Sequence, residues 1–155
     1  DCVIRTGELN NSSLVARPLG RFRWVTCASP DYLREYGVPP SPEALSQHRA
    51  VHYFSGQARR ADEFRFVRHG ETFSVPVSGN AAVNETGLYI KMCLAGFGLA
   101  QLAENIVADH LQEGRLVEVL TDWQPPPVPV TLLYPHQRFL SPAVRAFAEW
   151  MSEVV

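Results

Sequence analysis

Few side chains in this sequence have the types and spacing that chemistry requires. His48 and His52 are four residues apart, the spacing at which two imidazoles on one helix face hold a metal ion. No acidic general base follows them, and His52 falls in a predicted strand, so ordinary core or surface histidines are the favoured interpretation. The sequence contains no nucleophile elbow and no phosphate-binding loop. We therefore expect no catalytic residue, no metal, no cofactor and no enzyme activity.

The segment Gly96-Phe97-Gly98 begins like a dinucleotide-binding fingerprint. The third glycine of that fingerprint is missing, because position 101 is Gln. The two glycines also end a predicted helix, whereas the fingerprint follows a strand. Helix termination is the predicted role of this segment.

Polar residues also stand where α/β proteins bind ligands. Ser55 follows a predicted strand at 50–54, and Asn84, Glu85 and Thr86 begin a predicted helix. Ligands settle beyond the carboxyl ends of strands and at helix N-termini, where free N–H groups favour anions. The same residues also suit a helix that binds nothing, with Asn84 as N-cap and Glu85 as a first-turn acid. Both interpretations stay open at this stage.

Strands alternate with helices along the chain, which predicts an α/β fold. The predicted strands are 1–5, 12–19, 21–28, 50–54, 98–102, 116–120 and 130–134, and a hairpin joins 63–68 to 72–78. The predicted helices start at 29–30 and 41–42, cover 85–95 and 104–112, and start again at 141–142. The helix at 85–95 is apolar nearly all round, which predicts burial on both sides.

Composition excludes several classes of protein. The chain has 155 residues, 46% of them hydrophobic, and a net charge of −2, which fits one folded domain and argues against disorder. It has no basic excess for nucleic acid and no apolar run long enough to span a membrane. Cys2, Cys27 and Cys93 are an odd number and lie far apart, which fits a reducing cytoplasm.

A series of segments, taken in order, carries a family resemblance. The series begins with DCVIRTGEL and SSLVARPLGRFRWVTCASPDYL and continues through the hairpin into VPVSGNAAVNETGLYIKMCLAGFGLAQLAENIVADHL. It closes with GRLVEVLTDW and VPVTLLYPHQRFLSPAVRAFAEWM. These segments resemble the effector-binding region of a LysR-type transcriptional regulator, and the resemblance is collinear over nearly the whole chain. One departure is Ala103, which stands where the family usually has Pro.

The resemblance implies an α/β, periplasmic-binding-protein-like (type 2) effector domain. Residues 18–122 would form a complete regulatory subdomain II. Residues 1–17 and 123–155 would be two pieces of a truncated subdomain I, with the Pro-rich stretch at 125–129 as the second crossover. The DNA-binding domain is expected to be absent from this chain. The missing elements would leave Val3, Leu132 and Phe147 short of apolar partners.

The resemblance also implies the ligand and its site. A small effector, often a carboxylate or an aromatic metabolite, would bind in a cleft between the subdomains. An Arg facing a helix N-terminus suits an anion, but the Glu85 carboxylate opposes one. Either the effector is not anionic at that end, or Glu85 points at a donor. The matching positions are Arg5, Thr6, Ser55, Asn84, Glu85, Thr86 and Phe97.

The leading interpretation is the sensor module of a cytoplasmic regulator. It would form a homo-oligomer, contact DNA only through the missing N-terminal domain, and have no membrane partner. The alternative is an extracytoplasmic solute-binding protein of the same fold. An enzyme built on this fold is a third class, which the lack of a catalytic set disfavours.

Overall fold

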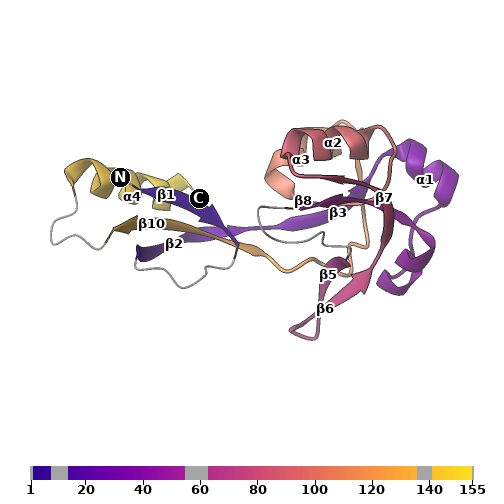
Figure 1. Ribbon diagram of the computed structural model, residues 1–155, viewed down its shortest axis with the longest axis horizontal. Coiled ribbons are helices and arrows are strands. Elements are labelled where there is room, and N and C mark those ends of the chain that lie inside the picture. Colours follow the sequence, from indigo (N-terminus) through magenta and orange to yellow (C-terminus); the bar gives the residue numbers. More distant parts are fainter. Residues whose placement is uncertain (1, 8–13, 55–62, 136–140, 155) are drawn as a thin grey trace. The chain divides into compact units, whose positions relative to one another are not determined.

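Two crossings of the chain divide the computed structural model into two units (Figure 1). Unit 1 comprises Asp1–Phe22 and Pro127–Val155, and unit 2 comprises Arg23–Pro126. The structure describes residues 2–7, 14–54, 63–135 and 141–154, with side chains through Met151. The sequence placed the boundaries at 17/18 and 122/123, and contacts within the chain place them a few residues later at both crossings.

Unit 1 is a small antiparallel sheet with one helix. The strands β1 (Val3–Thr6), β2 (Leu14–Phe22) and β10 (Val128–Pro135) lie in the order β1-β10-β2, and α4 (Pro142–Val154) follows them. The predicted apolar face of α4 is confirmed, since Ala148 is buried while Arg145 and Glu149 are exposed.

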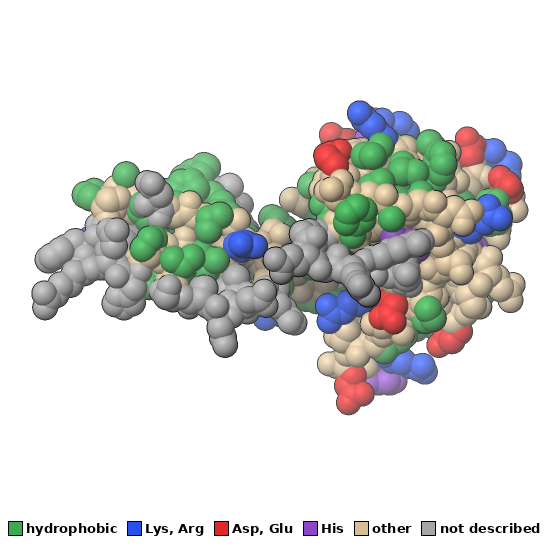
Figure 2. All heavy atoms as spheres, in the orientation of Figure 1, with side chains coloured by type: hydrophobic (Ala, Val, Ile, Leu, Met, Phe, Trp, Pro, Cys, Tyr) green, Lys and Arg blue, Asp and Glu red, His purple; other side chains and the backbone are tan. Residues whose placement is uncertain are grey.

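The apolar faces of unit 1 differ from the expectation. Leu132 is wholly buried in a cluster with Leu19, Val130 and Ala148, so the prediction that it lacks partners is wrong. Val3 remains 47% exposed. Figure 2 shows hydrophobic side chains gathered on the visible face of this unit.

Unit 2 contains several short strands instead of one continuous sheet. The central strand β3 (Trp24–Ala28) lies between β8 (Ala100–Ala103) and β9 (Val117–Val119), and both neighbours are antiparallel to it. Burial of β3 on both faces agrees with its β-branched and apolar sequence. The helices are α1 (Pro30–Tyr36), the 3-10 helix η1 (Pro42–Gln47), α2 (Thr86–Leu94) and α3 (Glu104–Gln112).

The strand β7 (Ser78–Val83) is missing from the sequence-based expectation. It pairs in parallel with β4 (Arg49–Tyr53), in the register Val51↔Ala81. A Cβ added to Gly79 would lie 2.1 Å from the Ala50 carbonyl oxygen and 2.6 Å from His52 Nε2. Only glycine therefore lets the two strands approach so closely.

The predicted hairpin is confirmed, with its first strand as predicted and its second strand at 71–76 instead of 72–78. The strands β5 (Glu63–Arg68) and β6 (Glu71–Pro76) pair over their whole length, and the turn residues between them have positive φ. Phe64 and Phe66 of β5 are buried, because alternate residues of the strand face the core.

Helix α2 differs from the prediction at its start and in its burial. Glu85, not Asn84, is the N-cap, so the helix begins at Thr86. Tyr89 and Cys93 are buried, but Leu88 is 47% exposed, so the helix is covered on one side only. The helix ends before Gly96, whose φ is 79°, which confirms helix termination as the role of that glycine.

Ala103, which stands where the family usually has Pro, is accommodated at the start of α3 by a backbone hydrogen bond. Ala103 is the N-cap of α3 and offers no side-chain hydrogen bond. The backbone N–H of Glu104 instead donates to the carbonyl of Arg23, at 2.9 Å. No helix among the described residues is long and apolar enough to cross a membrane.

Candidate functional site

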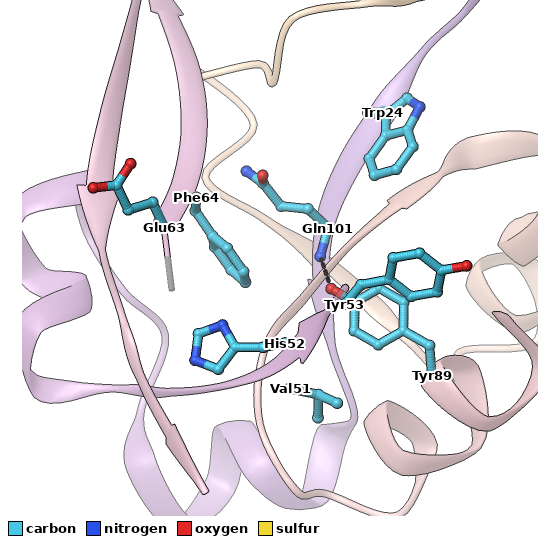
Figure 3. Close-up of a pocket in the computed structure, with 8 residues that line it drawn as sticks. All are labelled: Trp24, Val51, His52, Tyr53, Glu63, Phe64, Tyr89 and Gln101. Carbon is cyan, nitrogen blue, oxygen red and sulfur yellow. Dashed lines mark hydrogen bonds between the residues drawn. The ribbon is translucent and has the colours of Figure 1, made fainter. Parts of the chain in front are cut away.

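Unit 2 contains a partly open pocket with aromatic walls (Figure 3). Its volume is about 180 Å³. Side chains from five elements surround it, so its shape depends on how β3, β4, β5, α2 and β8 pack together. The lining residues are Trp24, Val51, His52, Tyr53, Glu63, Phe64, Tyr89 and Gln101.

The two tyrosines of the pocket are fixed by neighbouring groups. Their rings are tilted by 46° with centroids 5.5 Å apart. The Tyr89 hydroxyl accepts a hydrogen bond from the backbone N–H of Gln101, at 3.1 Å. Burial raises the pKa of Tyr89, so the phenol stays neutral at physiological pH. Tyr53 donates to the carbonyl of Asn84, at 3.4 Å, which places the pocket beside the start of α2.

Gln101 connects the pocket to the hairpin. Its side-chain amide donates to the Arg65 carbonyl at 3.0 Å and accepts from the Arg65 N–H at 3.1 Å. The same NH₂ group donates to the Thr26 hydroxyl, at 3.2 Å. Figure 3 shows Phe64 and His52 on one side of the pocket and Trp24 and Tyr53 on the other.

The charge of the lining bears on the ligand that it suits. Among the described lining residues none is Lys or Arg, and Glu63 carries a carboxylate. Among these described residues, a ligand carboxylate would find no Lys or Arg to offset its desolvation. The aromatic rings and Val51 instead favour a planar apolar group.

The N-terminus of α2 is occupied by the chain itself. The Glu85 carboxylate accepts hydrogen bonds from the N–H groups of Gly87 at 2.7 Å and Leu88 at 2.6 Å. These two bonds hold the pKa of Glu85 below its usual value. Of the two possibilities that the sequence left open, Glu85 therefore points at donors, and they belong to its own helix.

The seven residues named from the sequence are distributed over both units. Arg5 and Thr6 are neighbours on β1 in unit 1, both exposed. Asn84 and Thr86 are exposed at the start of α2 in unit 2. Phe97, 58% exposed, follows the other end of this nine-residue helix, roughly 13 Å along its axis. Ser55 lies outside the described residues.

The two histidines considered as metal ligands have other surroundings. The Nδ1 atom of His48 lies 3.1 Å from the Tyr32 hydroxyl, and burial lowers the pKa of His48. His52 lines the pocket. The described part of the chain contains no group of three or more His, Cys, Asp or Glu side chains that could hold a metal ion.

None of the eight lining residues was a sequence-based candidate for binding the effector, although His52 was considered as a metal ligand. The strand at 50–54 was predicted, but the residue predicted to contact the ligand was Ser55, which comes after it in the sequence. Aromatic residues near the ends of strands, such as Trp24 and Tyr53, were the available signal. It is a weak signal, because aromatic residues at such positions usually belong to the core.

Two α/β units joined by two chain crossings are typical of a periplasmic-binding-protein-like ligand-binding domain, and solved structures bear out this class. The LysR substrate binding domain matches residues 1–155, and the chain belongs to the LysR-type transcriptional regulator family.

Curated relatives agree with this assignment. The chain is 37% identical over 155 residues to the uncharacterized HTH-type transcriptional regulator YhjC of Escherichia coli. It is also 37% identical over 154 residues to an HTH-type transcriptional repressor of Pseudomonas aeruginosa. These matches cover 100% and 99% of this chain but 52% and 49% of the relatives, so the chain spans about half their length. The relatives are named regulators, so the solute-binding alternative is not favoured.

Solved structures show the same fold. The regulatory domain of CrgA from Neisseria meningitidis matches 99% of this chain and 74% of its own, at 25% identity and a TM-score of 0.82. The full-length Vibrio cholerae virulence activator AphB matches 99% of this chain and 51% of its own, at 27% identity and a TM-score of 0.79.

Proposed function

We propose that this chain is the effector-sensing and oligomerisation module of a LysR-type transcriptional regulator. The single observation that carries the proposal is the aromatic pocket of unit 2 in a chain of this family. The module itself would be non-enzymatic and cytoplasmic, and DNA would be contacted by a separate helix-turn-helix part of the regulator. Unit 2 would correspond to regulatory subdomain II, and unit 1 to the two pieces of subdomain I.

The size of the pocket supports a small effector group. A cavity of about 150 Å³ lined by apolar side chains is known to hold one benzene ring. The pocket, at about 180 Å³, therefore suits one six-membered ring with a short substituent. Stacking or tilted contacts with Tyr53 and Phe64 would add to the gain from burying the ring.

The charge around the pocket supports a group that is not anionic. Glu85 already occupies the first N–H groups of α2, and no Lys or Arg is among the described lining residues. Of the two classes expected from the resemblance, an aromatic metabolite fits this pocket better than a carboxylate does. That the effector also contacts the positions named from the sequence stays a prediction; they are Arg5, Thr6, Ser55, Asn84, Glu85, Thr86 and Phe97.

A matched pair of probes tests the proposal. Benzamide and benzoate have the same ring, but only benzoate is charged. A ligand at ten times its Kd stabilises the folded state by about 1.4 kcal/mol, which raises Tm by about 3–6 °C in a chain of this length. We expect benzamide to reach this shift at a lower concentration than benzoate.

A pocket-filling variant provides the control. In Phe64→Trp the larger ring occupies the space for the probe, and the benzamide shift should disappear while the far-ultraviolet circular dichroism spectrum is unchanged. Equal shifts in the wild type and in Phe64→Trp would show that the probe binds elsewhere. A stronger response to benzoate would refute the assignment of an uncharged group.

A further inference from the structure

The outer edge of strand β5 is attached to the rest of unit 2 by hydrogen bonds to two glutamines, through the side chain of Gln101 and the backbone carbonyl of Gln124. In an antiparallel pair, alternate residues direct their backbone groups away from the partner strand. On the edge of β5 that faces away from β6, the N–H of Arg65 donates to Gln101 Oε1 at 3.1 Å. The N–H of Val67 donates to the carbonyl of Gln124 at 2.9 Å. Strand β8 and the segment after β9 therefore both hold one edge of the hairpin.

The attachment at Gln101 replaces a strand. The hairpin is a separate two-stranded sheet, and no described ladder joins it to β8. The Gln101 amide accepts from the N–H of Arg65 and donates to its C=O, as a neighbouring backbone would. Burial of Phe64 and Phe66 stabilises the packing of the hairpin, but hydrophobic burial is not directional. The pair of hydrogen bonds to Gln101 instead fixes the position of β5 relative to β8.

The attachment at Gln124 lies where the chain leaves unit 2. Pro126 is the last residue of the unit, and Pro125 precedes it. The Gln124 side chain donates to the Thr121 carbonyl, at 2.6 Å, which closes a turn just before this proline segment. A displacement of Val67 would therefore be transmitted to the crossover through its hydrogen bond to Gln124, and not through strands β3, β8 and β9.

The other end of this connection lies in the pocket. Phe64 lines the pocket and directly precedes Arg65. Gln101 also lines it, and its backbone N–H is held by the buried Tyr89 hydroxyl. A ligand in contact with Phe64 would therefore press on the element that both glutamines hold.

We propose that the β5–β6 hairpin relays the filling of the pocket to the crossover at 124–126, with Gln101 as the positioning residue that sets the place of the hairpin. This inference rests on the proposed function, since the pocket must bind a ligand for the relay to operate. The positioning role of Gln101 can be tested without any ligand.

Amide hydrogen exchange, measured by NMR at Arg65 and Val67 in the 155-residue chain, reports on the hairpin directly. Gln101→Met keeps the length of the side chain but removes its hydrogen bonds. We expect exchange at both amides to accelerate about tenfold or more, because the two bonds of ordinary strength between Gln101 and Arg65 are lost. Gln101→Glu keeps the acceptor for Arg65 and should restore most of the protection. Gln112→Met, the same change on the exposed face of α3, is the matched control and should change neither amide.

The second arm adds benzamide at saturation. In the wild type, ligand should change the exchange rate at Val67 severalfold, and in Gln101→Met this response should be lost. Acceleration at Arg65 alone in Gln101→Met would overturn the relay, because Gln101 would then act only locally. Benzamide binding with no response at Val67 would also overturn it while leaving the pocket intact. Failure of benzamide to bind the wild type would refute the proposed function, and the ligand-free exchange would still decide the role of Gln101.

Discussion

Gly79→Ala is a test of how closely β7 and β4 approach. The added Cβ would lie 2.1 Å from the Ala50 carbonyl oxygen, and Cβ atoms are essentially never found within 3.0 Å of such atoms. The backbone must therefore move by about an ångström at a point where β4 carries three pocket residues. Overpacking of a core usually costs about 1–3 kcal/mol, and contact with backbone on a paired strand places Gly79→Ala at the upper end.

The expected effect on Tm follows from the size of the chain. At about 2–4 °C per kcal/mol, a loss of about 3 kcal/mol lowers Tm by about 6–12 °C. His52 would also move, because its Nε2 atom lies 2.6 Å from the added Cβ, so the affinity for benzamide should fall.

A second glycine separates lack of space from backbone strain. Gly114 has a φ of +68° and nothing within 4 Å of an added Cβ, so Gly114→Ala pays only the left-handed backbone cost of about 1–2 kcal/mol. Thermal melts followed by circular dichroism compare the two variants. The reasoning is refuted if Gly79→Ala melts within 2 °C of the wild type, roughly the effect of 1 kcal/mol, or if Gly114→Ala loses more stability than Gly79→Ala.

Three further variants test polar contacts. Tyr89→Phe should cost about 1–3 kcal/mol in chemical denaturation, because the N–H of Gln101 loses its acceptor; an unchanged midpoint would contradict this. Glu85→Ala should lower Tm at pH 7. Because the pKa of Glu85 is depressed in the folded state, its carboxylate stabilises the fold at pH values above the usual pKa of 4.5. The difference in Tm between the wild type and Glu85→Ala should therefore be present at pH 7 and vanish by pH 3, and a constant difference would exclude the cap. Burial lowers the pKa of His48 in the folded state, so on acidification the unfolded chain binds a proton at a higher pH than the folded chain does. The free energy of unfolding should therefore fall as the pH drops below about 6.5, and His48→Gln should reduce this pH dependence.

Sequence periodicity predicted most elements of unit 2 but not β7. The hairpin has alternating apolar residues and a turn with Gly, so its signal is local. The segment Ser78–Val83 contains Gly, Asn and two Ala, all poor strand formers. It becomes a strand because β4 offers a parallel partner and Gly79 permits the approach. A strand that forms through a tertiary contact of this kind need not show the alternating hydrophobic pattern by which strands are predicted from sequence.

The candidate site shows the same division between local and tertiary signals. The sequence placed polar residues correctly near the start of α2, but it assigned the cap to Asn84. Two residues can each cap the same helix, and only the fold decides which carboxylate or amide reaches the N–H groups. The pocket could not be predicted, because Phe64 and Gln101 come from segments that meet only through the packing of the hairpin on β8.

The most direct test of the proposed pocket is an NMR titration of the ¹⁵N-labelled chain with benzamide. The resonances of the Trp24 indole N–H and the Gln101 side-chain amide report from two sides of the pocket. We predict that both shift along one saturating curve with a single Kd, and that neither shifts in Phe64→Trp. Shifts confined to the amides at the start of α2, or shifts that persist in Phe64→Trp, would contradict an effector site in the aromatic pocket.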